Sequence, residues 1–211
     1  MSLIPPHGQL RDFLPADEHG DLLVWVMANQ HRFTPATIKR DPAKPSMVDE
    51  TARIALRLRD LGPLETVLRE RLLDALPAVM AAAGAQEPAP RSLELELTAY
   101  GDGAFYGPHL DLPIGPDRKP LGANPGEDRL ISGVYYFHAR PKQFEGGELH
   151  LYPFGPGDGD DEAGMSIEPI DNSLAVFPSW ARHAVRPVRC TSGNFADYRF
   201  ALNCWYCRAL G

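Results

Sequence analysis

The spacing of hydrophobic residues changes near residue 91, and this change limits the possible folds more than any other feature of the chain. Up to that point apolar residues recur every three or four positions, which is the spacing of one helical face. From Ser92 onward they alternate with polar residues, or form short runs between Gly and Pro, as strands do. Helical and strand-forming segments that are separated along the chain predict an α+β protein.

The first part of the chain contains two candidate helices. Residues 17–28 carry an apolar stripe, and Asp17 is a suitable residue to cap the first turn. Pro63 opens the second candidate, in which leucines and valines recur at helical spacing until Gly84 ends it. Residues 29–49 are interrupted by prolines and predict a loop or an extended segment. We expect both helices to pack on a sheet through their apolar faces.

A series of short strands is expected in the second part. In the first strand, three leucines at 93, 95 and 97 share one face, and Glu94 and Glu96 point away, so we expect a half-buried strand. Turns rich in Gly and Pro separate the other candidates, and many short strands of this kind predict a sandwich or a barrel. These further candidates are residues 106–112, 130–138, 147–153, 173–178, 182–189 and 198–206.

Two connections between these strands are long and irregular. Residues 113–128 and 154–164 are rich in Gly, Pro and Asp and show no hydrophobic period. Long irregular loops on a β scaffold often carry function. We therefore expect at least one of them to border the entrance of a site, and we leave open whether they close over a substrate.

Length, charge and cysteine content exclude several classes of protein. A chain of 211 residues with 44% hydrophobic content can form one domain with a full core. Because 28 acidic residues outnumber 21 basic ones and no basic run occurs, we do not expect nucleic acid as a partner. No segment has the pattern of a secretory signal or a membrane span. The odd number of cysteines fits a reducing compartment, so we expect a cytoplasmic protein, and the oligomeric state stays open.

Three residues of the second part could bind a metal ion. His109 and Asp111 lie two positions apart in a predicted strand, so their side chains leave the same face. This pair alone is also compatible with a structural histidine. His183, on a later predicted strand, is a candidate third ligand. Two imidazoles and one carboxylate suit iron(II) and leave coordination positions open for oxygen chemistry.

Several blocks of sequence, taken together, resemble a known family. Residues 100–111, YGDGAFYGPHLD, resemble the metal-binding stretch of the prolyl-hydroxylase-like branch of the Fe(II)/2-oxoglutarate-dependent dioxygenase superfamily. Further blocks follow in that family's order: VYYF at 134–137, GGEL at 146–149, FPSWARHAVRPV at 177–188 and RFALNCW at 199–205. The resemblance covers about residues 93–206, and the N-terminal half matches only loosely.

The resemblance implies a fold and a domain plan. The fold would be a double-stranded β-helix, or jelly roll, with supporting N-terminal helices. Residues 1–211 would then form a single dioxygenase domain. Within it, residues 1–91 would be mainly helical support and residues 92–211 the jelly-roll core.

The resemblance also implies roles for individual residues. His109, Asp111 and His183 would hold iron(II). Arg199 would pair with the distal carboxylate of 2-oxoglutarate, and Tyr136 would donate a hydrogen bond to that carboxylate. A guanidinium suits this task because it forms two parallel hydrogen bonds with a carboxylate. Tyr100, from its position before the His-x-Asp motif, would line the metal-proximal end of the same pocket.

The strand pattern is compatible with Arg199 in this role. In a regular strand over 182–189, Arg182 and Arg186 would face away from His183, and Arg189 would lie too far from it. Residues 190–197 have the composition of a hairpin connection, which would return the chain beside the His183 strand. Arg199 would then reach the pocket, and Tyr136 would meet it from across the barrel.

The activity implied is hydroxylation of an unactivated C–H bond, with molecular oxygen consumed and succinate and CO2 released. Ascorbate is a candidate reductant. The substrate would be peptidyl, with a prolyl side chain as one candidate, or a free small molecule. Retention of Asp111 argues against halogenation, because halogenating relatives lack that carboxylate. Two alternatives remain: a cupin-like metalloprotein of other chemistry, and a non-catalytic binding or sensing jelly roll. Neither of them needs Arg199 and Tyr136.

Other polar residues are expected to be structural. His138 and His150 fall in this group, and Glu148 is expected to face solvent. Two glycines at 146 and 147 would permit a tight entry into a strand. Cys204 and Cys207 are three positions apart in a strand, which puts their sulfurs on opposite faces and argues against a metal site there.

Overall fold

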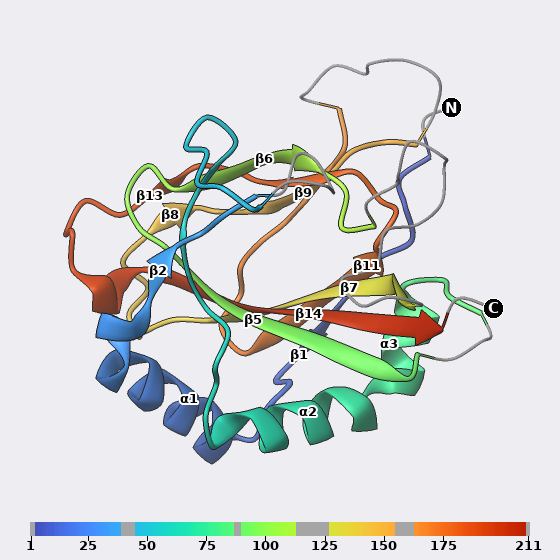
Figure 1. Ribbon diagram of the computed structural model, residues 1–211, viewed down its shortest axis with the longest axis horizontal. Coiled ribbons are helices and arrows are strands. Elements are labelled where there is room, and N and C mark those ends of the chain that lie inside the picture. Colours follow the sequence, from blue (N-terminus) through green and yellow to red (C-terminus); the bar gives the residue numbers. More distant parts are fainter. Residues whose placement is uncertain (1–2, 39–44, 87–89, 113–126, 155–162, 210–211) are drawn as a thin grey trace.

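The protein is built from two facing antiparallel β-sheets with helices packed on the outer face of the larger one (Figure 1). The computed structural model describes residues 3–38, 45–86, 90–112, 127–154 and 163–209. Helices and antiparallel sheets in one chain confirm the predicted α+β class. The helical elements are α1 (Ala16–Ala28), α2 (Leu64–Asp74) and α3 (Leu76–Ala82), with short 3-10 turns η1 (Gln30–Arg32) and η2 (Phe195–Asp197).

The larger sheet, here called the major sheet, has the strand order β1-β11-β7-β14-β5-β4-β2. The C-terminal strand lies at its centre and pairs with β5 on one side and β7 on the other. Residues 200–207 of β14 are therefore paired with a strand on both sides. The strands of the major sheet are β1 (Gly8–Arg11), β2 (Thr34–Pro35), β4 (Leu56–Leu58), β5 (Ser92–Tyr100), β7 (Glu127–Phe137), β11 (Ser173–Pro178) and β14 (Arg199–Ala209).

The smaller sheet, here called the minor sheet, has the order β10-β9-β12-β6-β3 and lies over the inner face of the major sheet (Figure 1). A separate two-stranded ladder pairs β8 with β13. The strands of the minor sheet are β3 (Arg53–Ile54), β6 (Phe105–His109), β9 (Leu149–Leu151), β10 (Met165–Ile167) and β12 (His183–Val185). The ladder consists of β8 (Glu145–Gly146) and β13 (Val188–Arg189).

The observed strands differ from the predicted ones mainly where the chain changes sheets. The strand expected over 173–178 is β11, with the same bounds. The strand expected over 182–189 is interrupted at Arg186 and Pro187, since proline has no N–H to donate to a ladder. The strand expected over 147–153 is shortened to β9, and the short strand β8 precedes the predicted range. The N-terminal ninety residues, expected to be mainly helical, also contribute the four short strands β1 to β4.

The helices agree with the sequence in place but not in every boundary. α1 lies where it was predicted, but Pro15 occupies the N-cap and Asp17 lies within the first turn, so the predicted Asp17 cap is wrong. The second predicted helix is broken into α2 and α3 after Asp74. Pro77 explains the break, because it lacks a backbone donor and is best tolerated in the first turn of a new helix.

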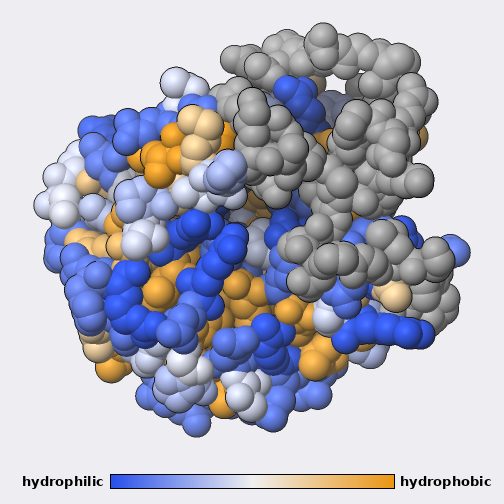
Figure 2. All heavy atoms as spheres, viewed as in Figure 1, coloured by the Kyte–Doolittle hydropathy of each residue, from blue (hydrophilic) through white to orange (hydrophobic). Residues whose placement is uncertain are grey.

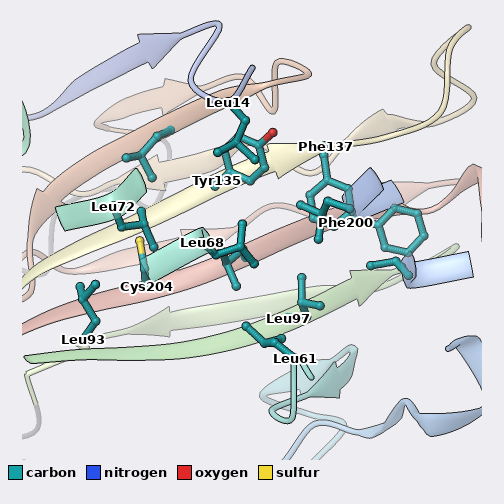
Figure 3. Packing of buried hydrophobic residues seen from close by; sticks show 14 of the residues in the cluster. Leu14, Leu61, Leu68, Leu72, Leu93, Leu97, Tyr135, Phe137, Phe200 and Cys204 are labelled. Carbon is teal, nitrogen blue, oxygen red and sulfur yellow. The ribbon is translucent and has the colours of Figure 1, made fainter. Parts of the chain in front are cut away.

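The main hydrophobic core lies between the helices and the outer face of the major sheet (Figure 3). Leu68 and Leu72 of α2 point toward this sheet, where Leu97, Phe200 and Cys204 lie. A second cluster, which includes Tyr136, Phe177 and Ala201, lies between the two sheets. The major sheet is therefore buried on both faces.

Burial on both faces corrects the expectation for the first strand. The leucines of β5 share one face, as predicted, and that face packs against the helices. The opposite face lies toward the minor sheet rather than in water. Glu96 is accordingly only 3% exposed, so β5 is not half-buried and this carboxylate does not face solvent. A buried carboxylate needs compensating partners, and Glu96 pairs with the buried Arg53 and with Arg57 and Arg59.

Most of the two long connections, residues 113–126 and 155–162, lies outside the described residues, so their predicted place at the site entrance stays a prediction.

The face seen in Figure 2 is mainly hydrophilic, with hydrophobic residues visible between polar ones. Within the described part of the chain, no helix combines the length and the apolar composition that a bilayer span requires. The cytoplasmic location inferred from the cysteines stays a prediction.

The packing of α2 on the major sheet predicts a strong contrast between two adjacent leucines. Leu72 is 1% exposed, whereas Leu73 is 46% exposed. We expect Leu72→Ala to lower the free energy of unfolding by about 2–5 kcal/mol, because it leaves a cavity in the core. We expect Leu73→Ala to change it by only about 0.5 kcal/mol. Urea denaturation of both variants measures the difference, and equal losses would contradict the assigned packing.

Candidate active site

The three predicted metal ligands come together at one point of the minor sheet. One potential ligand atom from each of His109, Asp111 and His183 lies within 4.8 Å of the other two. The Nε2 atom of His109 is 3.6 Å from Oδ1 of Asp111, and the Nε2 atom of His183 is 3.5 Å from Oδ2. Such an arrangement presents two imidazole nitrogens and a carboxylate to a common centre.

The strand register explains how the two histidines meet. His109 is the last residue of β6, and His183 is the first residue of β12, directly opposite it in the antiparallel ladder. The pairing shifts by one residue beyond this pair, as a β-bulge does, and the two rings lie 4.1 Å apart. Asp111 lies beyond the end of β6, so the turn after the strand, not strand alternation, brings its carboxylate back to the histidines.

Backbone hydrogen bonds fix the orientation of both imidazoles. Nδ1 of His109 is 2.9 Å from the carbonyl oxygen of Gly107, and Nδ1 of His183 is 2.9 Å from that of Ala181. Because a carbonyl oxygen can only accept, Nδ1 carries the hydrogen in each ring and Nε2 offers a lone pair. This is the usual way in which a protein orients a metal-binding histidine.

Two serines that the sequence did not identify support the carboxylate. The hydroxyl of Ser132 on β7 donates to Oδ2 of Asp111 at 2.7 Å, and it lies 2.9 Å from the hydroxyl of Ser179. Ser179 also accepts a hydrogen bond from the backbone N–H of Leu112 through its carbonyl oxygen. The carboxylate is thus held from the major sheet while the imidazoles are held from the minor sheet. For the two serines, the only signal in the sequence is that Ser179 belongs to the block that contains His183.

The ionisation of these groups suits a cation. Burial alone would raise the pKa of Asp111, but the neighbouring His183 and His109 bring it well below its ordinary value. Burial, together with His109, lowers the pKa of His183 to about 4, against the opposing effect of Asp111. Near neutral pH the site therefore contains a carboxylate and a neutral His183. These are the protonation states that metal ligation requires.

The donor set fits iron(II). Two imidazoles and one carboxylate, all on one side of a centre, are typical of the facial arrangement that leaves positions open on non-haem iron. The open side faces a cavity of about 350 Å³ between the sheets. This cavity extends from the metal ligands to Arg199 and, in another direction, to the arginines of β3 and β4.

Arg199 lies deep in this cavity with much of its hydrogen-bonding capacity unused. The residue is 1% exposed, and its Nε donates to the carbonyl oxygen of Gly147 at 2.8 Å. Among the described residues, neither Nη1 nor Nη2 has a hydrogen-bond partner. A buried cation with two unpartnered donors is unfavourable by itself and is well suited to a carboxylate. The site therefore fits the distal carboxylate of 2-oxoglutarate.

Two tyrosines flank this guanidinium. Their ring centres lie 4.7 Å (Tyr100) and 4.9 Å (Tyr136) from the guanidinium carbon of Arg199. The Tyr136 hydroxyl is also buried without a partner in the described part of the chain, and burial raises its pKa to about 12, so it remains a donor at neutral pH. Three unsatisfied donors thus lie close together at this end of the cavity.

The structure corrects the path by which these residues meet. Residues 190–197 do not return the chain beside β12; they carry it to the facing major sheet, where Arg199 begins β14. Tyr136 lies on β7, the strand adjacent to β14, and not across the barrel. Tyr100 is directly opposite Arg199 on β5 and its ring lies against the guanidinium, and its place at the metal-proximal end of the pocket stays a prediction.

Gly147 is part of the wall against which Arg199 lies. Its φ of +73° is a conformation that favours glycine. A Cβ at this position would lie 2.7 Å from Cδ of Arg199 and 2.9 Å from Cγ2 of Val188. The paired glycines were expected to permit a tight strand entry, and the structure adds a reason for Gly147 in the placement of the arginine.

The remaining polar candidates lie away from the cavity. His138 is buried beside Phe144, and His150 contacts Ser166. Glu148 is partly buried rather than fully exposed, and its carbonyl oxygen accepts from the Arg186 N–H. Cys204 belongs to the helix-facing core, whereas Cys207 lies near Glu94 on the other face of β14, so the two thiols do not form a pair.

The chain matches the model of one protein family, the 2OG-Fe(II) oxygenase superfamily, over residues 95–207. It is also 29% identical to an uncharacterized PKHD-type hydroxylase of Synechocystis sp. (strain ATCC 27184 / PCC 6803 / Kazusa). That similarity covers 94% of this chain and 62% of the relative. The chain therefore spans less than two thirds of the relative's length.

Solved structures with a similar fold include two prolyl hydroxylases. A prolyl-4-hydroxylase of Pseudomonas putida has a TM-score of 0.64 at 22% identity, over 97% of this chain and 93% of that one. A prolyl hydroxylase from Trichoplax adhaerens, in complex with a peptide fragment of the hypoxia inducible factor oxygen degradation domain, has a TM-score of 0.65 at 18% identity. That likeness covers 95% of this chain and 83% of the other. The likeness confirms the jelly-roll fold.

The contact between Gly147 and Arg199 predicts a selective defect. We expect Gly147→Ala to push the guanidinium aside and to weaken binding of 2-oxoglutarate by roughly tenfold or more, because charge-assisted hydrogen bonds are lost. Metal binding should persist. Gly193→Ala is the matched control, because Gly193 also has a positive φ of +66°, but a Cβ there would have no atom of the described residues within 4 Å. Calorimetric titration of both variants tests this, and equal effects would refute the role of Gly147.

Proposed function

The chain belongs to the 2OG-Fe(II) oxygenase superfamily, and from this membership we propose that it is an iron(II)- and 2-oxoglutarate-dependent dioxygenase. It would hydroxylate an unactivated C–H bond of a peptidyl or small-molecule substrate and release succinate and CO2. Iron(II) and 2-oxoglutarate, when bound, would supply the electrons that reduce and so activate molecular oxygen. Ascorbate is a candidate reductant that would keep the iron in its ferrous state.

Each residue of the site has a defined task in this proposal. His109, Asp111 and His183 would hold iron(II) through the two Nε2 atoms and the carboxylate. The backbone carbonyls behind the imidazoles, and Ser132 behind the carboxylate, keep these ligands oriented before the metal arrives. Such preorganisation lowers the cost of assembling the site.

The co-substrate would be oriented from its far end. Arg199 would donate through Nη1 and Nη2 to the distal carboxylate of 2-oxoglutarate, and the Tyr136 hydroxyl would donate to the same group. Tyr100 would hold the guanidinium plane from the β5 side through its ring. Because these residues are buried, they also keep water away from the co-substrate and strengthen the charge pairing.

The observation that carries the proposal is that Nη1 and Nη2 of Arg199 have no partner among the described residues, in the same cavity as the three ligands. A cupin-like metalloprotein of other chemistry has no need for a buried cation at this position. A non-catalytic binding module would have no need for a metal ligand set with an open side. Neither alternative is favoured by a specific feature of the site.

The substrate class is the least defined part of the proposal. The Trichoplax adhaerens enzyme of similar fold binds a peptide fragment, and the Synechocystis relative is a PKHD-type hydroxylase, which supports a peptidyl substrate. A screen of peptides and metabolites for succinate release, with iron(II), oxygen and 2-oxoglutarate present, tests the activity. Release that depends on one class of compound would identify the substrate, whereas no release and no binding of 2-oxoglutarate would contradict the proposal.

We expect Asp111→Ala to abolish turnover and to leave the fold intact, because this carboxylate organises the metal site and not the core. Ser132→Ala removes only the supporting hydrogen bond, so it should lower metal affinity by about 10–100-fold and retain some activity. Succinate release, metal titration and circular dichroism of both variants measure these effects. Full activity of Asp111→Ala would remove it from the metal site, and an unfolded variant would show a structural role.

We expect Arg199→Ala to raise the concentration of 2-oxoglutarate needed for half-maximal turnover severely, roughly a hundredfold, because several charge-assisted hydrogen bonds disappear. Iron affinity should stay unchanged, since Arg199 touches none of the three ligands. Arg189→Ala is the control, because Arg189 is 73% exposed and pairs with Glu145 outside the cavity. An unchanged 2-oxoglutarate requirement in Arg199→Ala would show that another group binds the co-substrate.

A further inference from the structure

A cluster of three arginines surrounds one buried carboxylate in the wall of the active-site cavity, apart from Arg199. Nε of Arg59 lies 2.9 Å from Oε2 of Glu96, Nη2 of Arg53 lies 3.3 Å from Oε1, and Nη1 of Arg57 lies 3.5 Å from Oε2. All four residues line the cavity. We call Arg53, Arg57 and Arg59 the arginine cluster.

The arginine cluster contains more positive charge than its single acidic partner balances. Burial alone would raise the pKa of Glu96, but Arg53, Arg59 and Arg57 hold it below its ordinary value, so Glu96 is ionised and neutralises one guanidinium. Among the residues that the structure describes, no second carboxylate pairs with these three arginines. Within that part of the chain, two positive charges therefore remain unmatched at this wall.

Arg53 and Arg57 place two of the three positive charges inside the fold, whereas the Arg59 side chain is 69% exposed at the cavity mouth. Arg53 is 7% exposed, and its buried Nε has no hydrogen-bond partner among the described residues. Its guanidinium lies 4.7 Å from the ring centre of Tyr106, which stacks on the ring of His109 at 3.6 Å. One aromatic ring thus separates this cation from a metal ligand, which places the arginine cluster beside the reacting centre.

The arginine cluster and Arg199 occupy different places along the cavity. In the register of β5 and β14, Arg199 lies opposite Tyr100, and Asn203 lies opposite Glu96. Four residues of strand separate the two levels, which corresponds to roughly 13 Å. Arg57 and Arg59 contact Glu96 at the level of Asn203, away from the level of Arg199. The cavity therefore offers a second, separate place for an anion.

The neighbouring charges at the cavity wall do not neutralise this second place. Arg129 also lines the cavity, but it pairs with Glu94 and stacks on Trp205, with its guanidinium carbon 3.8 Å from the ring centre. That pair is balanced by itself. Asp111 is committed to the metal site by its contacts with His109, His183 and Ser132.

We infer that the hydroxylated substrate is an anion, whose carboxylate or phosphate group binds the arginine cluster while the C–H bond to be oxidised faces the metal. This inference rests on the proposed function, because it deepens the substrate class of the same site. Arg53 would contribute its available Nε, and Arg57 and Arg59 would contribute the charge that Glu96 leaves unmatched. Glu96 keeps the three guanidiniums together when no substrate is bound.

The test uses small anions as probes of the protein loaded with manganese(II) in place of iron and saturated with 2-oxoglutarate. Bound manganese accelerates nuclear relaxation of any molecule held near it. Inorganic phosphate, followed by phosphorus NMR, and carbon-13-labelled acetate, followed by carbon NMR, distinguish a phosphate-binding from a carboxylate-binding site. Because 2-oxoglutarate already occupies Arg199, a bound probe would be held by the arginine cluster. We expect relaxation enhancement for at least one probe that saturates with probe concentration and weakens as salt screens the charges.

Matched variants assign the effect to the arginine cluster. Arg57→Gln combined with Arg59→Gln removes two of the three positive charges and leaves the Arg53–Glu96 pair, so we expect probe affinity to fall by roughly tenfold or more. The control, Arg69→Gln combined with Arg140→Gln, removes the same charge from ion pairs outside the cavity and should change little. Glu96→Gln should act in the opposite direction and tighten probe binding.

The results separate this inference from the proposed function. Absence of saturable enhancement, or equal loss in the cluster variant and the control, would overturn the anionic substrate. In either case, binding of 2-oxoglutarate to the iron(II) protein, seen as charge-transfer absorption under anaerobic conditions, would show that the proposed function stands. Absence of that absorption in the wild-type protein would instead contradict the proposed function itself.

Discussion

The buried guanidinium of Arg199 is the constraint on which the rest of the site depends. A cation without partners is costly in an apolar interior, so a fold that retains one must surround and orient it. Tyr100 and Tyr136 flank it, and the Gly147 carbonyl accepts from its Nε. The absence of a side chain at Gly147 gives the arginine its space. These features leave two donors directed to a ligand.

The two sheets contribute different residues to the cavity. The minor sheet supplies both histidines through one cross-strand pair, and the major sheet supplies Ser132 behind the carboxylate and Arg199 at the far end. Helices on the outer face of the major sheet bury its other side, which holds the central strand β14 rigidly in place. Metal ligands and anion-binding groups therefore keep a fixed relation.

Much of this arrangement was predictable because it rests on local sequence patterns. The family's blocks indicated His109, Asp111, His183 and Arg199, and strand parity placed Arg199 and Asn203 on one face of β14, where both line the cavity. Alternation along a strand shows which residues share a face but not what packs against that face, so Glu96 was expected in solvent. Sequence spacing also cannot reveal that residues 190–197 cross to the other sheet. Nor does spacing reveal contacts between the sheets, such as that of Ser132 with Asp111.

The most direct measurement of the central claim is a crystal structure of the iron(II) protein grown anaerobically with 2-oxoglutarate. The account predicts a metal bound by His109, Asp111 and His183, with the distal carboxylate of the ligand within hydrogen-bonding distance of Nη1 and Nη2 of Arg199 and of the Tyr136 hydroxyl. A ligand whose distal carboxylate lies at the arginine cluster, or a metal bound elsewhere, would contradict it.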